Sequence, residues 1–324
     1  MRWTSAMLGL GLVLALPSVS AAQDEPYPSR TVRLIAAAGP GGNPDVVARL
    51  LAQKFTETMG RAFVVENIPG AGGVVAANMV AKGNPDGHLL MLGDSGALAI
   101  NAALNPNLSY HPVNDFTPIT ALATLPTIMV ASPTVPATTL AEFIALAKKE
   151  PGKMSYGSAG PGSIHHLTMA IFSDRAGIDL LHVPYRGGSA MVNALLTGEI
   201  QVGWSGIPNV KPLIEDGRLR AYCVSILERS PSMPSVPTCD EVGQKGFDIA
   251  TMMGLQAPAG APAKVVARLQ AETAKVMREP AMAARLTQLG IVMQEKGTAH
   301  YTQFMKEDME RYAAAVRRLN LQIK

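Results

Sequence analysis

The sequence predicts an α/β protein with two lobes, each a mixed sheet flanked by helices. Three observations lead to this fold class. The chain has 324 residues, which exceeds one average domain. Past Tyr27, short β-branched runs alternate with stretches of helical periodicity, as in βαβ units. Two segments, at about 121–130 and 219–227, resemble crossings between lobes, and two connecting segments would make a hinge.

The expected elements follow in chain order. The first part of the chain alternates between strand and helix patterns at 32–37 (strand), 45–59 (helix), 63–66 and 89–92 (strands). The middle continues with 128–131 (strand), 139–148 (helix), 154–156 (strand), 163–176 (helix), 180–183 (strand), 189–197 (helix), 201–204 and 219–225 (strands). Thr139 and Glu142 have the spacing of a capping box. The last part is predicted to form helices at 263–277 and 298–319.

These elements are predicted to divide into a signal peptide at 1–22, a discontinuous first lobe of 23–123 plus 226–324, and a second lobe of 124–225. In the last helix Tyr301, Phe304, Met305 and Tyr312 recur at helical spacing. Such a stripe favours packing in the core over a partner surface.

Composition excludes several classes of protein. Hydrophobic residues make up 48% of the chain and charged residues 16%, with a net charge of +3, which is too apolar for a disordered chain. Aromatic residues make up only 5%, and the lysines and arginines are scattered. Both the basic stripe and the stacking platform of a nucleic-acid binder are therefore missing, and nucleic acid is not an expected partner.

The N-terminus has the pattern of a cleaved signal peptide. Arg2 precedes an apolar run at 6–16, and small residues follow Pro17. The run is too short to span a bilayer, which takes about 20 apolar residues. Cleavage after Ala21 or Ala22 would release a periplasmic protein, whereas a buried N-terminal helix is the plainer alternative. An oxidising compartment permits Cys223 and Cys239 to bond, but the sequence leaves open whether they do.

The stretch Gly-Pro-Gly-Gly-Asn-Pro-Asp at 39–45 falls between the first strand and the first helix. Asn43 is predicted to be the N-cap, with Pro44 after it, and Gly41 and Gly42 would let a ligand approach the backbone. Free amides at a helix N-terminus form an anion site. An ordinary turn is the alternative. Asp45 is expected to bind a water, an amine or the loop itself.

A second glycine loop at 157–163 again follows a strand and precedes a helix. Ser163 is predicted to cap that helix, and Ser158 is predicted to be free to donate its hydroxyl. His165 and His166 come next, and because they are adjacent on a helix, at most one can face a cleft. Two such loops on two lobes could clamp one carboxylate, since ligands of α/β proteins sit beyond the carboxyl ends of the strands.

Two more loops occupy equivalent strand ends. Ser95 follows the strand at 89–92, and Tyr185 and Arg186 follow the strand at 180–183. Arg186 is the only cation in these loops and could meet a carboxylate through two hydrogen bonds, or could be a solvated surface residue.

Enzyme motifs fail by position. The glycines at 70 and 72 lack the rest of a dinucleotide fingerprint, and the serines at 95 and 205 have glycine one place too early for a nucleophile elbow. The six histidines lack metal-site spacing, so no metal and no cofactor is expected. An exported α/β hydrolase that uses Ser95 or Ser158 with one of the histidines stays open as an alternative.

Seven ordered segments resemble the periplasmic solute receptors of tripartite tricarboxylate transporters, also called Bug-type receptors. They are GPGGNPDVVARLLA (39–52), PGAGG (69–73), AKGNPDGHLLML (81–92), YHPVNDFTPI (110–119), YGSAGPGSIHHL (156–167), HVPYRGGSAMVNALLTGEIQVGW (182–204) and RSPSMPSVPTCDEVG (229–243). The resemblance implies a type II-like periplasmic binding protein, with the ligand between two lobes joined by two crossings.

The resemblance also implies the site. A ligand carboxylate would be held, partly through waters and backbone amides, by Gly41, Gly42 and Asp45 and by Ser158, Gly162 and Ser163, with Ser95 and Tyr185 lining the pocket. Arg186 and Ser205 complete the predicted ligand-binding residues. The chain departs from the family's usual residues at Asn43, Pro44, Ala38 and Ser205, which leaves the other end of the ligand undetermined.

The implied function is ligand capture without catalysis. The protein is expected to be an exported monomer that binds a small carboxylate and delivers it to integral-membrane subunits of a tripartite tricarboxylate-type transporter. A sensor subunit that presents its liganded form to a signalling partner would share the fold and the pocket, and so remains an alternative.

Overall fold

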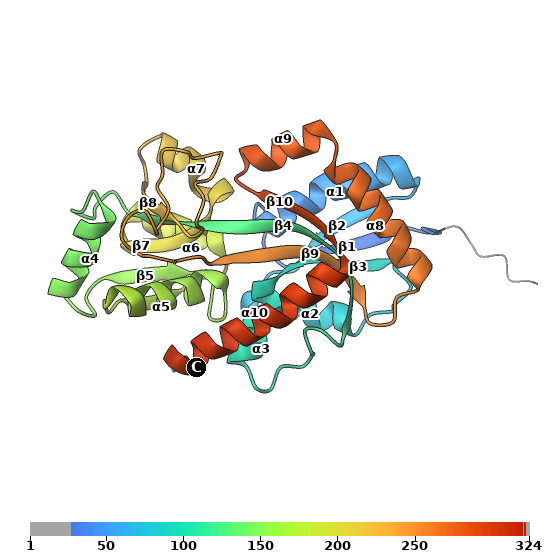
Figure 1. Cartoon of the computed structure of the whole chain (residues 1–324), viewed down its shortest axis with the longest axis horizontal. Coiled ribbons are helices and arrows are strands. Elements are labelled where there is room, and N and C mark those ends of the chain that lie inside the picture. The colour runs from blue at the N-terminus through green and yellow to red at the C-terminus, as the bar shows by residue number, and fades with distance from the viewer. Residues whose placement is uncertain (1–26, 320, 322–324) are drawn as a thin grey trace, which may run out of the picture.

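The computed structural model describes residues 27–319 and 321, and they form two lobes side by side (Figure 1). The predicted signal peptide and its cleavage site lie outside the described residues. Within the described part, no helix combines the length and the apolar character needed to cross a membrane.

The first lobe is built on a mixed sheet. Strands β1 (Val32–Ala36), β2 (Phe63–Asn67) and β3 (Leu89–Asp94) are parallel, and β9 (Ala250–Pro258), β4 (Phe116–Ala131) and β10 (Val292–Gly297) are joined to them by antiparallel pairing. One face is covered by α1 (Asn43–Met59), α8 (Ala263–Met277) and α9 (Pro280–Gln288). The other is covered by α2 (Val74–Ala81), α3 (Asn101–Leu104) and α10 (Thr298–Leu319).

The second lobe has the same layered plan. Parallel strands β5 (Ser155–Ser158), β6 (Leu181–Pro184) and β7 (Val202–Gly206) meet the far end of β4, which also pairs with β8 (Arg220–Val224). Helices α4 (Leu140–Lys149) and α5 (Ile164–Ala176) cover one face, and α6 (Gly188–Thr197) and α7 (Ile207–Glu215) cover the other. In α4 the Thr139–Glu142 capping box is confirmed, with both of its hydrogen bonds present.

Strand β4 is the first crossing between the lobes. Its early residues pair with β9 and β10, whereas residues from Thr127 onward pair with β7 and β8 (Figure 1). Buried side chains alternate along its second half, so that Met129 packs toward α4 and α5 while Ile128 packs toward α6 and α7. The sequence predicts only the end of this strand, at 128–131.

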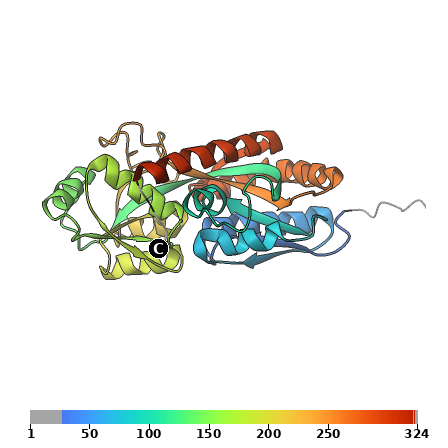
Figure 2. The same cartoon turned by 90° about the horizontal axis from the view of Figure 1, so that it is seen from below.

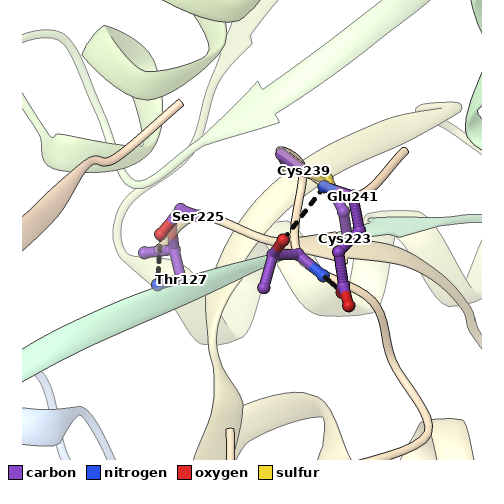
Figure 3. The surroundings of a disulfide bond; sticks show 6 residues. Thr127, Cys223, Ser225, Cys239 and Glu241 are labelled. Atoms are coloured by element: carbon purple, nitrogen blue, oxygen red, sulfur yellow. Dashed lines mark hydrogen bonds between the residues drawn. A yellow bond between two sulfur atoms is a disulfide. The ribbon is translucent and has the colours of Figure 1, made fainter. Parts of the chain in front are cut away.

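The chain returns to the first lobe through β9, which begins at Ala250. Before that return, the segment 226–249 packs on the second lobe, where Phe247 joins the cluster around Trp204. The Cys223–Cys239 disulfide ties this segment to β8, beside the hydrogen bond between Thr127 and Ser225 (Figure 3). These contacts favour a second lobe that extends to about residue 249. Closing a loop of this length by a disulfide stabilises a fold by about 3 kcal/mol.

Helix α10 lies along both lobes (Figure 2). Its predicted stripe is buried at Tyr301, Met305 and Tyr312, which pack on the first lobe. Near its C-terminal end, Arg318 forms an ion pair of 3.2 Å with Asp174 of α5, in the second lobe. The helix therefore makes a third connection between the lobes, beyond the two crossings.

Candidate functional site

A cavity of about 820 Å³ lies between the two lobes. The first lobe lines it with the loops that follow β1, β2 and β3, and the second lobe with the loops that follow β5, β6 and β7. All six are the carboxyl ends of parallel strands, where α/β proteins bind their ligands. The two glycine loops predicted from the sequence thus face one cavity from opposite lobes.

Five helices of the described chain begin at the wall of this cavity. Their N-cap residues all line it, and they are Gly42 of α1, Gly73 of α2, Ser163 of α5, Gly187 of α6 and Gly206 of α7. The first turn of a helix leaves N–H groups without intrahelical acceptors, and its dipole is positive there. Helix starts from both lobes therefore make the wall favourable for an anion.

Asp45 supports the first glycine loop from behind and does not line the cavity. It is 3% exposed, accepts hydrogen bonds from the Gly41 amide (2.9 Å) and the Asn67 side chain (2.9 Å), and pairs with Arg49. Burial alone would raise the pKa of Asp45, but these partners outweigh it and hold the pKa below its usual value. Of the three expected partners of Asp45, the structure shows the loop itself.

The first residues of α1 differ from the prediction. The N-cap is Gly42, and Asn43 is the first residue of the helix, so the prediction of Asn43 as N-cap is wrong. The reason is geometric, because Asn43 extends across the cleft toward Gly206. A methyl group placed on Gly206 would lie 2.8 Å from Asn43 Nδ2. Gly41 adopts φ +79° and lies behind the wall, whereas Gly42 lines it.

Ser158 and Ser163 shape the second glycine loop. Ser163 caps α5 as predicted, since its hydroxyl accepts from the His166 amide. Its hydroxyl also donates to the Gly160 carbonyl at 2.7 Å. Ser158 is fully buried, accepts from the Gly160 amide (3.1 Å) and lies 2.7 Å from His182 Nε2. The prediction that Ser158 is free to donate its hydroxyl is therefore wrong, because that hydroxyl is already bonded to the Gly160 backbone and to the His182 ring.

A stack of rings lies under this loop. The His166 and His182 rings are parallel with their centroids 4.2 Å apart, and Tyr156 stacks on His182 at 4.8 Å. Burial lowers the pKa of His182 to about 4, helped by the neighbouring His166, and burial also lowers the pKa of His166. The stack is therefore neutral at neutral pH. Of the adjacent pair, only His165 lines the cavity.

The charged side chains of the wall are few. Among the described lining residues, Arg186 is the only lysine or arginine and Asp94 the only aspartate or glutamate. Arg186 is exposed. Tyr185 also lines the cavity, and its hydroxyl donates to Glu199 at 2.7 Å, so that hydroxyl is held within the second lobe. Burial lowers the pKa of His165 to about 4, so this lining ring is neutral.

Three other predicted positions lie outside the cavity wall. Ser95 is fully buried, and its hydroxyl accepts from the Met252 amide at 3.3 Å. Ser205 is also fully buried, with its hydroxyl near the Gly206 carbonyl. Gly162 adopts φ +75° next to Gly72 of the opposite lobe. The buried hydroxyls of Ser95 and Ser158 leave neither serine placed to attack a ligand in the cavity.

Several lining residues were not predicted. They include the loop Pro69 to Gly73, Asp94, Thr127, His165, Asn209 and Thr251. Within that loop Ala71 adopts φ +46°, a conformation that non-glycine residues rarely take and that clusters at functional sites. The signal for the loop was available, because PGAGG directly follows the second predicted strand, as the other site loops follow theirs.

The lobes touch on both sides of the cavity. Asn43 of the first lobe lies against Gly206 of the second, and a methyl group on Gly72 would lie 3.2 Å from the Gly162 carbonyl carbon. The turn at Gly290 likewise lies against Ile207. These approaches bring the two lobes into contact beside the cavity.

Comparison with known proteins agrees with this geometry. The model of the tripartite tricarboxylate transporter family receptor matches residues 47–321. The chain belongs to this family. A curated relative is the UPF0065 protein in the tcbD-tcbE intergenic region of Pseudomonas sp. strain P51, 34% identical over 94% of this chain and 91% of its own length. The resemblance drawn from the sequence is thereby confirmed.

Solved structures of similar proteins have the same fold. The periplasmic binding protein BugD is 31% identical with a TM-score of 0.87, covering 92% of this receptor and all of BugD. Rhodopseudomonas palustris MatC, solved with bound malate, is 32% identical with a TM-score of 0.85, covering 90% of this receptor and all of MatC. Rpa4515 of R. palustris, solved with adipate, is 28% identical with a TM-score of 0.88, covering 91% of this receptor and 99% of Rpa4515.

These comparisons confirm the predicted fold class, a two-lobed periplasmic binding protein. The receptor belongs to a family of periplasmic solute-binding proteins, and its family and structural neighbours are binding proteins rather than enzymes. Membership of a family of periplasmic binding proteins implies that the protein is exported.

Proposed function

We propose that this receptor captures a small carboxylate between its lobes and delivers it to the integral-membrane subunits of a transporter. One observation carries the proposal. Five helix starts, two of them in the predicted glycine loops, line a single cavity together with Arg186. Backbone amides and a guanidinium that converge from opposite lobes are suited to a carboxylate group.

The relatives support the class of ligand. MatC binds malate and Rpa4515 was solved with adipate, and both are small dicarboxylates. A cavity of about 820 Å³ has room for such a molecule together with ordered water. A ligand held by both lobes favours the closed form by as much as it binds that form better.

A thermal-shift screen tests capture. Mono-, di- and tricarboxylates of four to eight carbons, with aromatic acids, are added to the mature protein, and a ligand at 100 times its Kd should add about 2.7 kcal/mol of stability. Isothermal titration then gives the Kd of each hit. A screen in which no carboxylate raises the melting temperature would refute capture of this class.

A separate experiment tests delivery. Membranes that contain the cognate transporter subunits are incubated with the receptor, with and without the hit ligand. Ligand-dependent retention of the receptor and uptake of labelled ligand into vesicles are expected. Retention on a soluble signalling partner instead, without uptake, would favour the sensor alternative.

A further inference from the structure

The five helix starts at the cavity wall differ in how well they suit an anion. The first turn of α1 contains the carboxylate of Asp45, which opposes the positive end of the helix dipole. In α5 the side chain of Ser163 already uses the His166 amide. In α7 the second residue is Pro208, which has no N–H group to offer. Of these five described starts, only α2 and α6 have no acidic residue in the first turn, no side-chain cap and no proline.

Side chains that can donate hydrogen bonds gather at the start of α6. A methyl group placed on Gly188, the first residue of α6, would lie 3.8 Å from Asn209 Nδ2 and 4.0 Å from His165 Cε1. Three elements therefore meet at this point, because His165 belongs to α5 and Asn209 to α7. Arg186 lies two residues before Gly188. The loop that leads into α2, residues 69–73, consists of proline, glycine and alanine, and so adds no such side chain of its own.

The side chains of Arg186 and Asn209 are available to a ligand. Both line the cavity, and neither has a hydrogen bond or an ion pair with another residue in the described part of the chain. A methyl group placed on Gly187, the N-cap of α6, would meet nothing within 4 Å, so open space lies beside this helix start. A guanidinium can donate two parallel hydrogen bonds to a carboxylate, and a side-chain amide can donate through its nitrogen.

The His165 ring supplies a further donor. It lines the cavity, and its Nδ1 is buried with no hydrogen-bond partner among the described residues. Because burial lowers the pKa of His165, the ring is neutral at pH 7 and only one of its nitrogens carries a proton. A buried N–H without an acceptor is rarer in proteins than a buried acceptor without a donor. We therefore assign the proton to Nε2, which makes the ring a hydrogen-bond donor.

We propose that the start of α6 is the anchor for the ligand's carboxylate, which is bound by the first-turn amides of α6 and by Arg186, Asn209 and His165. The inference rests on the proposed function, because it takes the ligand to be a carboxylate. All parts of the anchor belong to the second lobe, so its geometry does not depend on contact between the lobes. The first glycine loop then approaches the bound carboxylate from the opposite lobe.

A change of charge within the anchor tests the inference. Asn209→Asp keeps the shape of the side chain and adds a negative charge, and an aspartate in the first turn of α7 is compatible with the helix. Titration calorimetry of the mature protein uses butyrate, malate, adipate, citrate and benzoate as probes. For each acid that binds the wild type, the variant should raise the Kd by about tenfold or more, because like charges repel.

Two variants provide matched comparisons. Asn193→Asp makes the same substitution at an exposed position of α6 outside the cavity lining, and should leave every Kd unchanged. Ala71→Asp adds the same charge at the start of α2, the rival site. Ala71 is exposed, lines the cavity and has φ +46°, which aspartate adopts more readily than alanine. This variant should raise the Kd less than Asn209→Asp does.

The variant His165→Phe tests the ring as a donor. Phenylalanine keeps an aromatic ring in the wall but offers no N–H group, so the Kd should rise by about tenfold. A Kd equal to that of the wild type would remove His165 from the anchor. Thermal unfolding of every variant separates lost folding from lost affinity.

The outcomes are distinct. A folded Asn209→Asp that binds as tightly as the wild type overturns the inference, and so does a larger rise of the Kd in Ala71→Asp; carboxylate capture stands in both cases. If Asn209→Asp does not fold, Arg186→Gln at its exposed position takes its place under the same criterion. Absence of binding of all five acids to the wild type refutes the proposed function instead.

Discussion

The two glycine loops present similar walls to the cavity but are held in place by different chemistry. In the first lobe a charged carboxylate, Asp45, gathers the Gly41 amide, Asn67 and Arg49. In the second lobe neutral groups hold the loop. The Ser158 hydroxyl bonds to the Gly160 amide and to the stacked His182 ring. A backbone that must keep its amides free for a ligand needs a support behind it, and that support can be ionic or neutral. The two supports respond to different perturbations.

Acid gives the largest expected difference between the loops. The pKa of His182 is about 4 in the folded protein and 6.5 in the unfolded chain, so the unfolded state binds the proton first. The stability contributed by the neutral ring is complete above pH 6.5 and is lost as the pH falls toward 4, by at most about 3 kcal/mol, because solvent screens this half-buried ring in part. Urea unfolding between pH 7 and pH 4 measures the loss.

The variant His182→Gln keeps a hydrogen-bonding side chain near Ser158 and should flatten that pH dependence. Equal slopes for wild type and His182→Gln would show that the stack does not cause the acid sensitivity of this lobe.

Removal of the ionic support has the next largest effect. Asp45→Ala leaves the Gly41 amide, the Asn67 amide and the Arg49 guanidinium without their acceptor, and should lower the free energy of unfolding by about 2 kcal/mol. Carboxylate affinity should fall as well, because the loop loses its fixed shape. Titration calorimetry measures the carboxylate affinity, and urea unfolding measures the free energy of unfolding.

Arg49→Ala provides the matched comparison, since Arg49 is the exposed partner of the same network, with 57% of its side chain exposed. An exposed ion pair contributes at most about 1 kcal/mol. If Arg49→Ala costs as much as Asp45→Ala, the support depends on the ion pair and not on the buried hydrogen bonds.

Crowding within the first loop gives the smallest effect. A methyl group on Gly42 would lie 3.0 Å from Ala38 Cβ and 3.2 Å from the Gly39 carbonyl oxygen, so Gly42→Ala must shift the loop. We expect carboxylate affinity to fall about tenfold, or 1.4 kcal/mol, with little change in stability because the φ of −69° suits alanine. Titration calorimetry measures the change in carboxylate affinity.

A second substitution tests the cause. Ala38→Gly in the Gly42→Ala background removes one of the two close neighbours and should recover part of the lost affinity. A double variant that binds as weakly as Gly42→Ala would mean that the methyl group blocks the ligand directly, and not through the shape of the loop.

The site loops could be predicted because their signals are local. A strand, then glycines, then a helical pattern appears at 39–45 and again at 157–163, and the carboxyl ends of parallel strands share one edge. Elements with strong periodicity were also placed well. The helices predicted at 263–277 and 298–319 have the observed bounds.

The long crossing strands could not be predicted in the same way. Strand β4 contains Pro118 and Pro126, and proline usually argues against a central strand. The structure tolerates Pro118 at a shift in register, and most of the strand is buried on both faces, which removes the alternating pattern. Helix α7, with Pro208 and Pro212, escaped detection for a related reason.

The roles of individual side chains were hidden because their partners are distant in the chain. Asp45 meets Asn67, 22 residues later, and Ser158 meets His182, 24 residues later. Whether a loop serine or aspartate faces a ligand or supports the backbone depends on such contacts from neighbouring strands. The residues around each loop do not indicate these distant contacts.

The ion pair between Arg318 and Asp174 has a mechanical consequence. Because α10 packs on the first lobe and its last turn contacts α5 of the second, any movement that separates α5 from the first lobe must break this ion pair or displace the end of the helix. Both side chains of the pair are exposed, so the pair alone resists such a movement by at most about 1 kcal/mol. The end of the helix can therefore bias the direction in which the lobes separate, but it cannot lock them together.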